Sequence, residues 1–414
     1  MATLLLYPDQ LWSNINSLIS SCEDIGEIFL LKDDLYYNIE YFHVDNSNTK
    51  IRLMEENILA FIRSNPRIKL IEFSSLIKFY TDLQQRTDKV VIFDPTNLLL
   101  VKKLSLFFKD RLTIEESPSF LIGMESLREF YEFIQKKKVS VSMFYNYFEK
   151  YIKVPGRHTL DTKSVEPLLL QVNCGLLNIK DLIQHSEFQT DIGLKSVLYR
   201  EYCRFIYLFM GTFNNVDLGG DTKEITLSLC NDNIFTNFTV SNALNNINKI
   251  SKRILKAELS LVFVNTLLVK LYSTGIITNQ EALFIFCNFC NCCFIDPKEI
   301  FLFLKQFTIG FHDWFLFHFV FSMGTYSDGG HLVNKAYIVG PNYISKNFSR
   351  EEYPLNERDT LIMNALYYNY IIANYSKLLS NRSMFNQLNV VYKTSIAKKE
   401  EFKRIANEFI LTLT

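Results

Sequence analysis

Short apolar runs separated by polar turns predict five strands in the first part of the chain. These runs are Thr3–Tyr7, Glu27–Leu31, Lys69–Phe73, Val90–Phe93 and a weaker one at Arg111–Ile114. Longer amphipathic segments between them, notably Lys50–Ser64 and Pro95–Lys109, have apolar residues at helical spacing. Strands that alternate with helices predict right-handed βαβ units, so we expect a parallel, Rossmann-like sheet.

Beyond Ser117–Ser119, where Pro118 interrupts the pattern, helical periodicity continues almost without strands. The predicted helices are Ser126–Lys136, Ser142–Tyr151, Leu194–Met210, Ile247–Ser273, Asn279–Cys293, Pro297–Phe307, Asp359–Leu379 and Lys398–Leu413. The polar stretch Gly211–Asn245, with Gly219-Gly220-Asp221 inside it, predicts a loop. We therefore expect an α/β domain over residues 1–118, a linker over 119–160 and a larger all-α domain over 161–414.

Composition is ordinary for a globular protein, with 48% hydrophobic and 21% charged residues, but 36 Phe and 22 Tyr stand against 14 Gly. This bias is typical of an AT-rich coding genome, such as that of a virus. The formal net charge is zero. A protein that binds many phosphates usually carries a basic excess, so the charge gives DNA binding no global support and leaves only a local basic groove open.

The sequence predicts an intracellular protein of the cytoplasm or nucleus. The N-terminal residues lack a basic region followed by a long apolar run, which argues against a secretory signal. No uncharged apolar stretch reaches the length of about 18 residues that a membrane span needs. Eight Cys without a signal peptide indicate reduced thiols.

Four of these cysteines, Cys287, Cys290, Cys292 and Cys293, are clustered and include one Cys-x-x-Cys spacing. Zinc sites place such pairs in turns and need a second pair, whereas this cluster falls in an apolar helical stretch, Ala282–Phe294. Free Cys commonly packs as a small hydrophobe. We therefore expect core packing and no metal. The charge runs at residues 136–138 and 398–401 predict solvated helix faces.

The most distinctive segment is Met323-Gly-Thr-Tyr-Ser-Asp-Gly-Gly330. Gly324, Gly329, Gly330 and the later Gly340 are close together in a glycine-poor chain. Glycine permits positive φ angles and a close approach of backbone to a ligand, and Asp328 could direct a carboxylate at a ring nitrogen. From these residues alone, a ligand loop and a plain surface loop between helices are both open.

The run from Asp313-Trp314 through this segment to Gly340-Pro-Asn-Tyr-Ile344 resembles the photolyase–cryptochrome superfamily, in particular the bacterial iron–sulfur (6-4) photolyases. That family has a Trp-containing helix, then Met-Ser-x-Tyr-Ala-Asp-Gly-Gly, Lys-Pro-Tyr and Gly-x-Tyr-Ile. Further segments match in the same order, namely Leu6–Leu11, Glu115–Leu121, Asn173–Leu177, Tyr199–Tyr202 and Asn364–Tyr367. The resemblance implies an N-terminal antenna-type domain, a helical FAD-type domain and damaged DNA as partner.

By this resemblance, Asp328 would face the isoalloxazine ring of FAD, and Gly329 and Gly330 would admit the cofactor. The other implied cofactor-binding residues are Tyr326, Asn173, Arg200 and Glu201. Trp314 lies in a helix that the resemblance associates with electron transfer to the flavin. Tryptophans and tyrosines are, however, more often core residues. The antenna pigment and the catalytic residues are not identified.

Three departures from the family argue against normal repair. The stretch Ser345–Met363 lacks the cysteines that ligate the family's [4Fe–4S] cluster, so we expect no cluster. Thr278-Asn279 replaces the two histidines that transfer protons to the lesion. Val165–Leu170 replaces the Ser/Thr residues of the phosphate-binding turn, and Glu166 would repel a pyrophosphate. Two hypotheses remain: a photolyase/cryptochrome-like flavoprotein that binds damaged DNA and, if active, repairs it with light, or a non-enzymatic photolyase-fold protein with a structural or interaction role.

Overall fold

A computed structural model describes residues 1–22, 24–37, 41–42, 49–95, 97–134, 139–149, 165–183, 191–210 and 242–413. The chain divides into two compact units. Unit 1 comprises Met1–Ile39, Ile51–Phe235 and Ile309–Phe315, and unit 2 comprises Glu40–Lys50, Thr236–Thr308 and Leu316–Thr414. Most of the predicted loop Gly211–Asn245 and the charge run at 136–138 lie outside the described residues.

A five-stranded parallel sheet forms the N-terminal part of unit 1. Its strands are β1 (Ala2–Leu6), β2 (Ile25–Leu31), β3 (Lys69–Ile71), β4 (Lys89–Phe93) and β5 (Leu112–Glu115). They are arranged in the order β3-β2-β1-β4-β5, with every neighbouring pair parallel. This confirms the predicted Rossmann-like sheet. The order reverses between β1 and β4, which makes their carboxyl ends the topological switch point.

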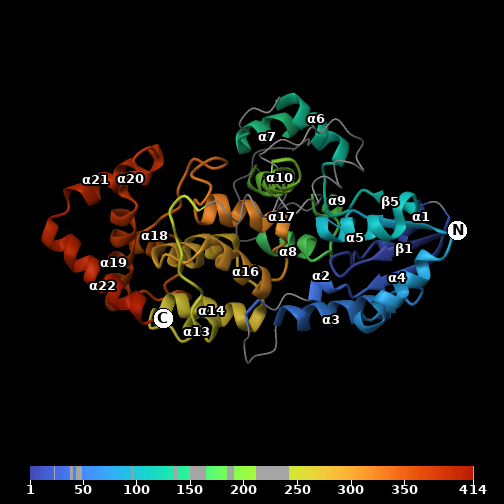
Figure 1. The fold of residues 1–414 in the computed structure, drawn as a ribbon, viewed down its shortest axis with the longest axis horizontal. Coiled ribbons are helices and arrows are strands. Elements are labelled where there is room, and N and C mark those ends of the chain that lie inside the picture. Colours follow the sequence, from blue (N-terminus) through green and yellow to red (C-terminus); the bar gives the residue numbers. More distant parts are fainter. Residues whose placement is uncertain are drawn as a thin grey trace. The chain divides into compact units, whose positions relative to one another are not determined.

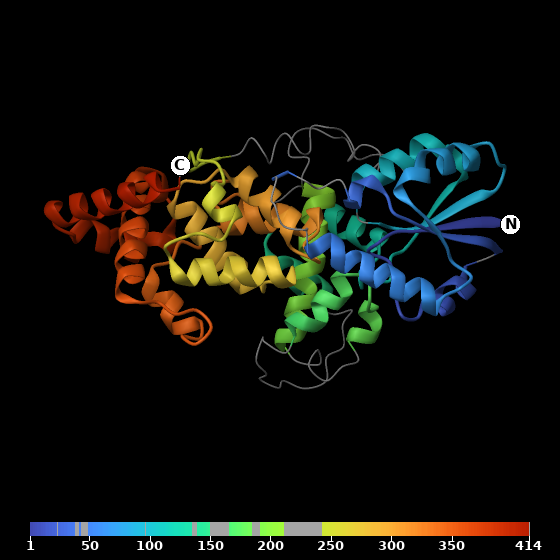
Figure 2. The same ribbon diagram turned by 90° about the horizontal axis from the view of Figure 1, so that it is seen from below.

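Helices cover both faces of this sheet (Figure 2). On one face, α1 (Ile15–Ser21) and α3 (Thr49–Ser64) contribute Ile15, Ile58 and Phe61 to a core with Leu4 and Leu30. On the other face lie α4 (Leu76–Gln84) and α5 (Leu98–Phe108). The amphipathic patterns predicted α3 and α5, whereas α1 and α4 were not predicted.

The rest of unit 1 is helical. Its elements are α2 (Asp34–Tyr37), α6 (Met124–Ile134), α7 (Val141–Phe148), α8 (Glu166–Asn173), α9 (Ile179–Leu182) and α10 (Asp191–Phe205), which continues as a π-helical turn over Ile206–Met210. The ring of Phe130 packs on Phe144, Phe148 and Phe205, so α6, α7 and α10 share one aromatic core. Helices were predicted at all three of these places.

Unit 2 is built from helices throughout its described part. These are α13 (Lys252–Leu255), α14 (Val262–Thr274), a π-helix (Glu281–Cys287) that continues as α15 (Asn288–Cys292), α16 (Pro297–Phe307), α17 (Asp313–Leu316, shared with unit 1), a π-helix (Phe317–Gly324), α18 (Pro341–Asn347), α19 (Glu357–Ala373), α20 (Tyr375–Leu378), α21 (Phe385–Lys393) and α22 (Ile396–Leu411). Helix α19 packs along α22 (Figure 1). The predicted fold class, a Rossmann-like α/β part followed by a larger helical part, is thereby confirmed, while the bounds 1–118, 119–160 and 161–414 stay predictions.

One predicted helix, Ile247–Ser273, is wrong as a single element, because the chain leaves the helix after Leu255 and starts α14 at Val262. Ala257 adopts a positive φ of 52° between the two helices. The backbone N–H of Val262 donates to Asp359 Oδ2 at 2.8 Å, which satisfies one of the donors left open at the new N-terminus. A contact with α19, distant in sequence, therefore stabilises the interruption.

The four clustered cysteines are fully buried, and burial raises the pKa of each thiol. Cys287 Sγ lies 3.0 Å from the position that a Cβ on Gly324 would occupy, so close packing at this point requires the glycine. Within the described ranges, no group of three or more possible ligands could hold a metal ion. No helix in the part of the chain that the structure describes is long and apolar enough to cross a membrane.

Candidate functional site

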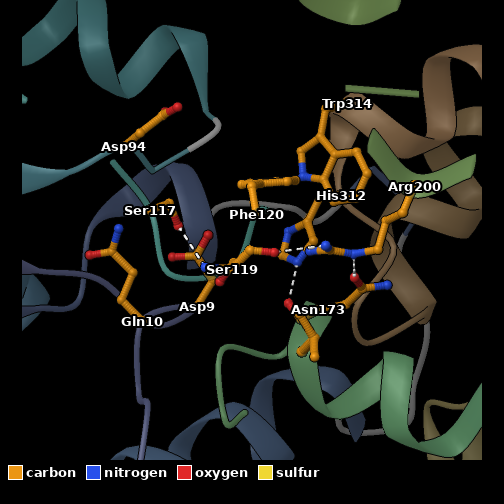
Figure 3. A pocket seen from close by; sticks show the side chains of 11 residues that line it. Asp9, Gln10, Asp94, Ser117, Ser119, Phe120, Asn173, Arg200, His312 and Trp314 are labelled. Carbon is orange, nitrogen blue, oxygen red and sulfur yellow. Dashed lines mark hydrogen bonds between the residues drawn. The ribbon is translucent and has the colours of Figure 1, made fainter. Parts of the chain in front are cut away.

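A small pocket lies in unit 1, where the loops after β1, β4 and β5 meet α8, α10 and the start of α17 (Figure 3). It is lined by Asp9, Gln10, Asp94, Ser117, Ser119, Phe120, Val172, Asn173, Arg200, His312 and Trp314. Three of the residues that sequence analysis assigned to the cofactor or to electron transfer, Asn173, Arg200 and Trp314, are thus brought together.

Arg200 on α10 is buried and engaged within the chain. Its Nη1 donates to the carbonyl oxygen of Ser119 at 2.7 Å, and its Nε donates to Asn173 Oδ1. The guanidinium also lies over the rings of Phe120 and Trp314, at 4.7 and 5.2 Å from their centroids. Burial lowers the pKa of Arg200 to about 10, so the side chain stays charged at neutral pH.

Glu201, the next residue, is fully buried beneath the same loop. Its Oε1 accepts a hydrogen bond from the backbone N–H of Leu121 at 2.9 Å. The guanidinium groups of Arg200 and Arg204 flank the carboxylate at 4.0 and 3.9 Å. Burial raises the pKa of Glu201, while the two arginines oppose that rise. Arg204 in turn pairs with Asp94, directly after β4, at 2.8 Å and donates to the carbonyl oxygen of Ile122 at 2.9 Å, so α10 holds the loops after β4 and β5 through a buried charge cluster.

Trp314 is 2% exposed and packs against the protein on several sides. Phe120 meets its ring edge-on at 5.3 Å, and the His312 ring stacks on it at 6.1 Å with 15° between the planes. The carbonyl oxygen of Asn173, 2.6 Å from His312 Nε2, can only accept, so Nε2 carries the proton. Sequence reasoning missed His312, although it directly precedes the matched Asp313-Trp314.

Asp9 was also missed. It follows β1 inside the matched Leu6–Leu11 segment, at a strand end where ligand groups are common. Among the described residues its Oδ1 has no hydrogen-bond partner and is out of solvent contact. Burial raises the pKa of Asp9 to about 7, against the opposing effect of the Tyr36 hydroxyl, and the charge of Asp94 adds to the rise.

The Gly-rich loop belongs to unit 2 and closes on itself. Asp328 Oδ1 accepts from the backbone N–H of Gly330 at 2.9 Å, and Oδ2 accepts from that of Leu332 at 3.0 Å. Gly329 and Gly330 have φ angles of 65° and 84°, and a Cβ on Gly330 would lie 2.5 Å from the Tyr326 hydroxyl. The glycines therefore serve the loop's own turn, and the close approach they allow is that of Tyr326.

Thr278, at the place of the family's histidines, caps a helix. Its Oγ1 accepts from the Glu281 N–H at 3.1 Å, and Glu281 Oε2 accepts from the Thr278 N–H at 2.7 Å, which is a capping box. Glu281 Oε1 also contacts Lys270 at 2.6 Å and the Tyr353 hydroxyl. Burial alone would raise the pKa of Glu281, but these donors outweigh it and hold the pKa below its ordinary value.

A partly exposed aromatic group lies elsewhere in unit 2. We define the aromatic platform as Phe284, Tyr337 and Tyr343 with Lys335. The Phe284 ring packs on Tyr343 at 4.7 Å and on Tyr337 at 6.0 Å, and Lys335 Nζ lies 4.8 Å above the Tyr337 ring. Asn288 anchors the chain at Val339, between Tyr337 and Tyr343, because its side chain exchanges two hydrogen bonds with the Val339 backbone at 2.9 and 3.0 Å.

The predicted residues therefore fall into two groups. Asn173, Arg200, Glu201 and Trp314 lie in unit 1, and Tyr326, Asp328, Gly329 and Gly330 form the loop of unit 2. Residues 166–170 of the replaced phosphate-binding turn form the first turns of α8, which Val165 precedes. Most of the polar groups in both sets already make hydrogen bonds within the chain, so few of them are left to bind a flavin. Their cofactor roles stay predictions.

The fold is that of a photolyase. A crystal structure described as an archaeal photolyase from Sulfolobus tokodaii with two FAD molecules superposes over 95% of this chain and 100% of its own, with a TM-score of 0.50 and 12% identity. A curated relative, the uncharacterized protein R855 of Acanthamoeba polyphaga mimivirus, is 37% identical over 95 residues, which cover 22% of this chain and 73% of that protein. The chain belongs to the same family as R855. No family model matches the sequence. The iron–sulfur subfamily stays a prediction.

Proposed function

We propose that this photolyase-fold protein binds DNA through the aromatic platform and does not repair it with light. The observation that carries the proposal is the packing of Phe284 edge-on against Tyr337 and at a tilt against Tyr343, with Lys335 beside them. Tyr343 is 37% exposed, and Phe284 and Tyr337 are half-buried, so the rings are held rigidly while part of their surface faces solvent.

Such a surface suits unpaired bases. Rings fixed in the protein offer stacking faces to any base, and a neighbouring cation attracts the phosphate backbone. Lys335 is exposed, and Lys346 lies one helical turn after Tyr343 on α18 and is exposed as well. Because the chain has no net charge, we expect binding that depends on stacking more than on phosphate contacts. Single-stranded or distorted DNA is the favoured ligand class.

The absence of repair is inferred from what replaces the family's reactive groups. Thr278 caps a helix and cannot transfer a proton near neutral pH, and Glu281 is held by Lys270 and Tyr353. Asp328 uses both carboxylate oxygens to close its own loop. These contacts support a protein that has kept the fold and a nucleic-acid surface while its former reactive positions stabilise structure.

Fluorescence anisotropy with a labelled single-stranded oligonucleotide tests the proposal. We expect Tyr343→Ala to raise Kd about five-fold to a hundred-fold, since one stacked base contributes about 1–3 kcal/mol. Lys335→Ala should lower the salt dependence of binding by about one unit of slope. The matched control is Tyr392→Ala, which removes a tyrosine that is 71% exposed on α21. Equal affinities of Tyr343→Ala and the wild type, or equal losses in both tyrosine variants, would refute DNA binding at the platform.

Light-driven, FAD-dependent repair is the second candidate. It is favoured by the ordered motif matches and by the photolyase fold shared with a protein whose crystal structure contains FAD. Its residues would be Asp328, Gly329 and Gly330 with Arg200 and Asn173. The absorption spectrum of the purified chain, followed by repair assays on (6-4) and cyclobutane lesions in light and dark, distinguishes the two candidates. Light-dependent repair would overturn the non-catalytic proposal. A purified protein that binds no DNA would overturn both candidate functions.

A further inference from the structure

The carboxyl edge of a doubly wound parallel sheet is where such units ordinarily take a ligand, at the point where the strand order reverses. In this chain the reversal falls between β1 and β4, and Asp9 and Asp94 follow these two strands. The resemblance to photolyases implies an antenna-type domain here. The fit of a pigment can therefore be judged from the side chains at this edge.

We propose that the α/β part of unit 1 has closed this edge with its own side chains and takes no flavin-sized pigment there. The free space in the pocket at the edge is about 10 Å³, which is room for about one water molecule. FMN and FAD are both far larger than that. The inference does not rest on DNA binding by unit 2.

Gln10 closes the gap between β1 and β4. Its Nε2 donates to the carbonyl oxygen of Phe93, the last residue of β4, at 3.0 Å. Its Oε1 accepts from the backbone N–H of Tyr7 at 3.2 Å. The amide is 1% exposed and spans the two strand ends, so it occupies the place through which a planar ring would enter.

The side of the pocket that faces α10 is closed by charge and hydrogen bonds. Asp94 is paired with Arg204 at 2.8 Å. Ser119 is held twice, since its Oγ accepts from Trp12 Nε1 at 3.1 Å and its carbonyl oxygen accepts from Arg200 at 2.7 Å. A ring that displaced Asp94 and Ser119 would leave the buried Arg204 and Arg200 without these partners, which costs several kcal/mol.

The β2 side of the edge is filled by tyrosines and a buried carboxylate. Tyr80 donates to Asp33 Oδ2 at 2.8 Å and lies 3.3 Å from the Tyr7 hydroxyl. Lys103 pairs with Asp33 at 2.9 Å, and the Tyr36 ring stacks on Tyr7 with 6.0 Å between centroids. The Tyr80, Asp33 and Lys103 side chains are thus bonded to one another. A pigment on this side would have to break this network, in which Asp33 and Tyr80 are out of solvent contact.

Hydrogen-exchange mass spectrometry of the full-length protein, with and without FMN, tests the inference directly. We expect no change in the exchange of the segments Tyr7–Leu11 and Val90–Asp94, because no flavin reaches the strand ends. Slower exchange of both segments on addition of FMN would overturn the inference. This measurement uses the wild-type chain, so it does not depend on whether any variant folds.

Equilibrium dialysis gives a second test with a variant. Ser117→Leu fills the pocket from the loop after β5 and should leave the amount of FMN bound per chain unchanged, whether that amount is zero or reflects a site in unit 2. Loss of bound FMN in a Ser117→Leu protein with a native circular dichroism spectrum would show a flavin at the edge and overturn the inference. Failure of DNA binding at the platform would change neither result.

Discussion

Arg200 donates from Nη1 to the carbonyl oxygen of Ser119 at 2.7 Å, and this bond joins α10 to the loop after β5. The sequence suggested Arg200 as a flavin contact. In the structure the same guanidinium holds Asn173 and stacks on Trp314. Arg200 is therefore a structural centre of unit 1, and its substitution should first be visible in stability.

We expect Arg200→Leu to lower the free energy of unfolding by about 3–5 kcal/mol, because it leaves Glu201 buried beside a single remaining arginine. Urea denaturation followed by circular dichroism measures the change. The control is Arg52→Leu, which breaks an exposed pair with Glu56 and should stay within about 1 kcal/mol of wild type. An Arg200→Leu protein as stable as the control would mean that Arg200 serves a ligand instead.

Thr278→Ala should cost about 1 kcal/mol of stability, since it removes the side-chain acceptor at the N-terminus of the helix that begins at Asn279. Thr278→Ser keeps the hydroxyl and should restore most of the loss. Thr266→Ala is a matched control, because the Thr266 hydroxyl bonds only to Val262 within its own helix. If all three variants melt together, the capping box contributes nothing and the position is open to another role.

Gly330 and Gly340 should respond differently to a substitution by serine. Gly330 has a φ of 84° and no room for a Cβ beside Tyr326, so Gly330→Ser should destabilise the protein by about 1–3 kcal/mol. Gly340 caps α18 with a φ of −89° and has its nearest side-chain contact at 3.7 Å, so Gly340→Ser should be tolerated. Thermal unfolding of the pair checks this, and equal melting temperatures would contradict it.

The fold could be predicted largely from the sequence because local patterns carry it. Alternating apolar runs marked all five strands, and Pro297–Phe307 was predicted with the bounds that α16 has. The interruption before α14 could not be predicted, because Lys256-Ala257-Glu258 contains neither Gly nor Pro. It depends on a hydrogen bond from Val262 to Asp359, and such a contact across the sequence leaves no local signal.

The candidate site was predictable as a set of positions and not as chemistry. The motifs singled out Asp328 and Arg200 as cofactor-binding residues and Trp314 as an electron-transfer residue, and these roles stay predictions. They could not indicate that Asp328 bonds its own loop, since that depends on φ angles at Gly329 and Gly330. His312 was missed because a single histidine next to a motif carries no periodic or spacing signal.

Asp9 should make stability fall as pH rises toward neutrality. Its pKa is about 7 in the folded protein, and an unfolded Asp titrates near about 3.9. Between these values the folded state binds more protons than the unfolded state, so the free energy of unfolding decreases with pH until Asp9 is ionised above pH about 7. Asp9→Asn removes this dependence. The difference in unfolding free energy, variant minus wild type, should therefore rise from about pH 4 to about pH 7 and then level off.

The control is Asp110→Asn, which changes an exposed carboxylate in the same unit. Parallel curves for wild type and Asp9→Asn would show that burial, with the charge of Asp94, does not hold Asp9 in its protonated form.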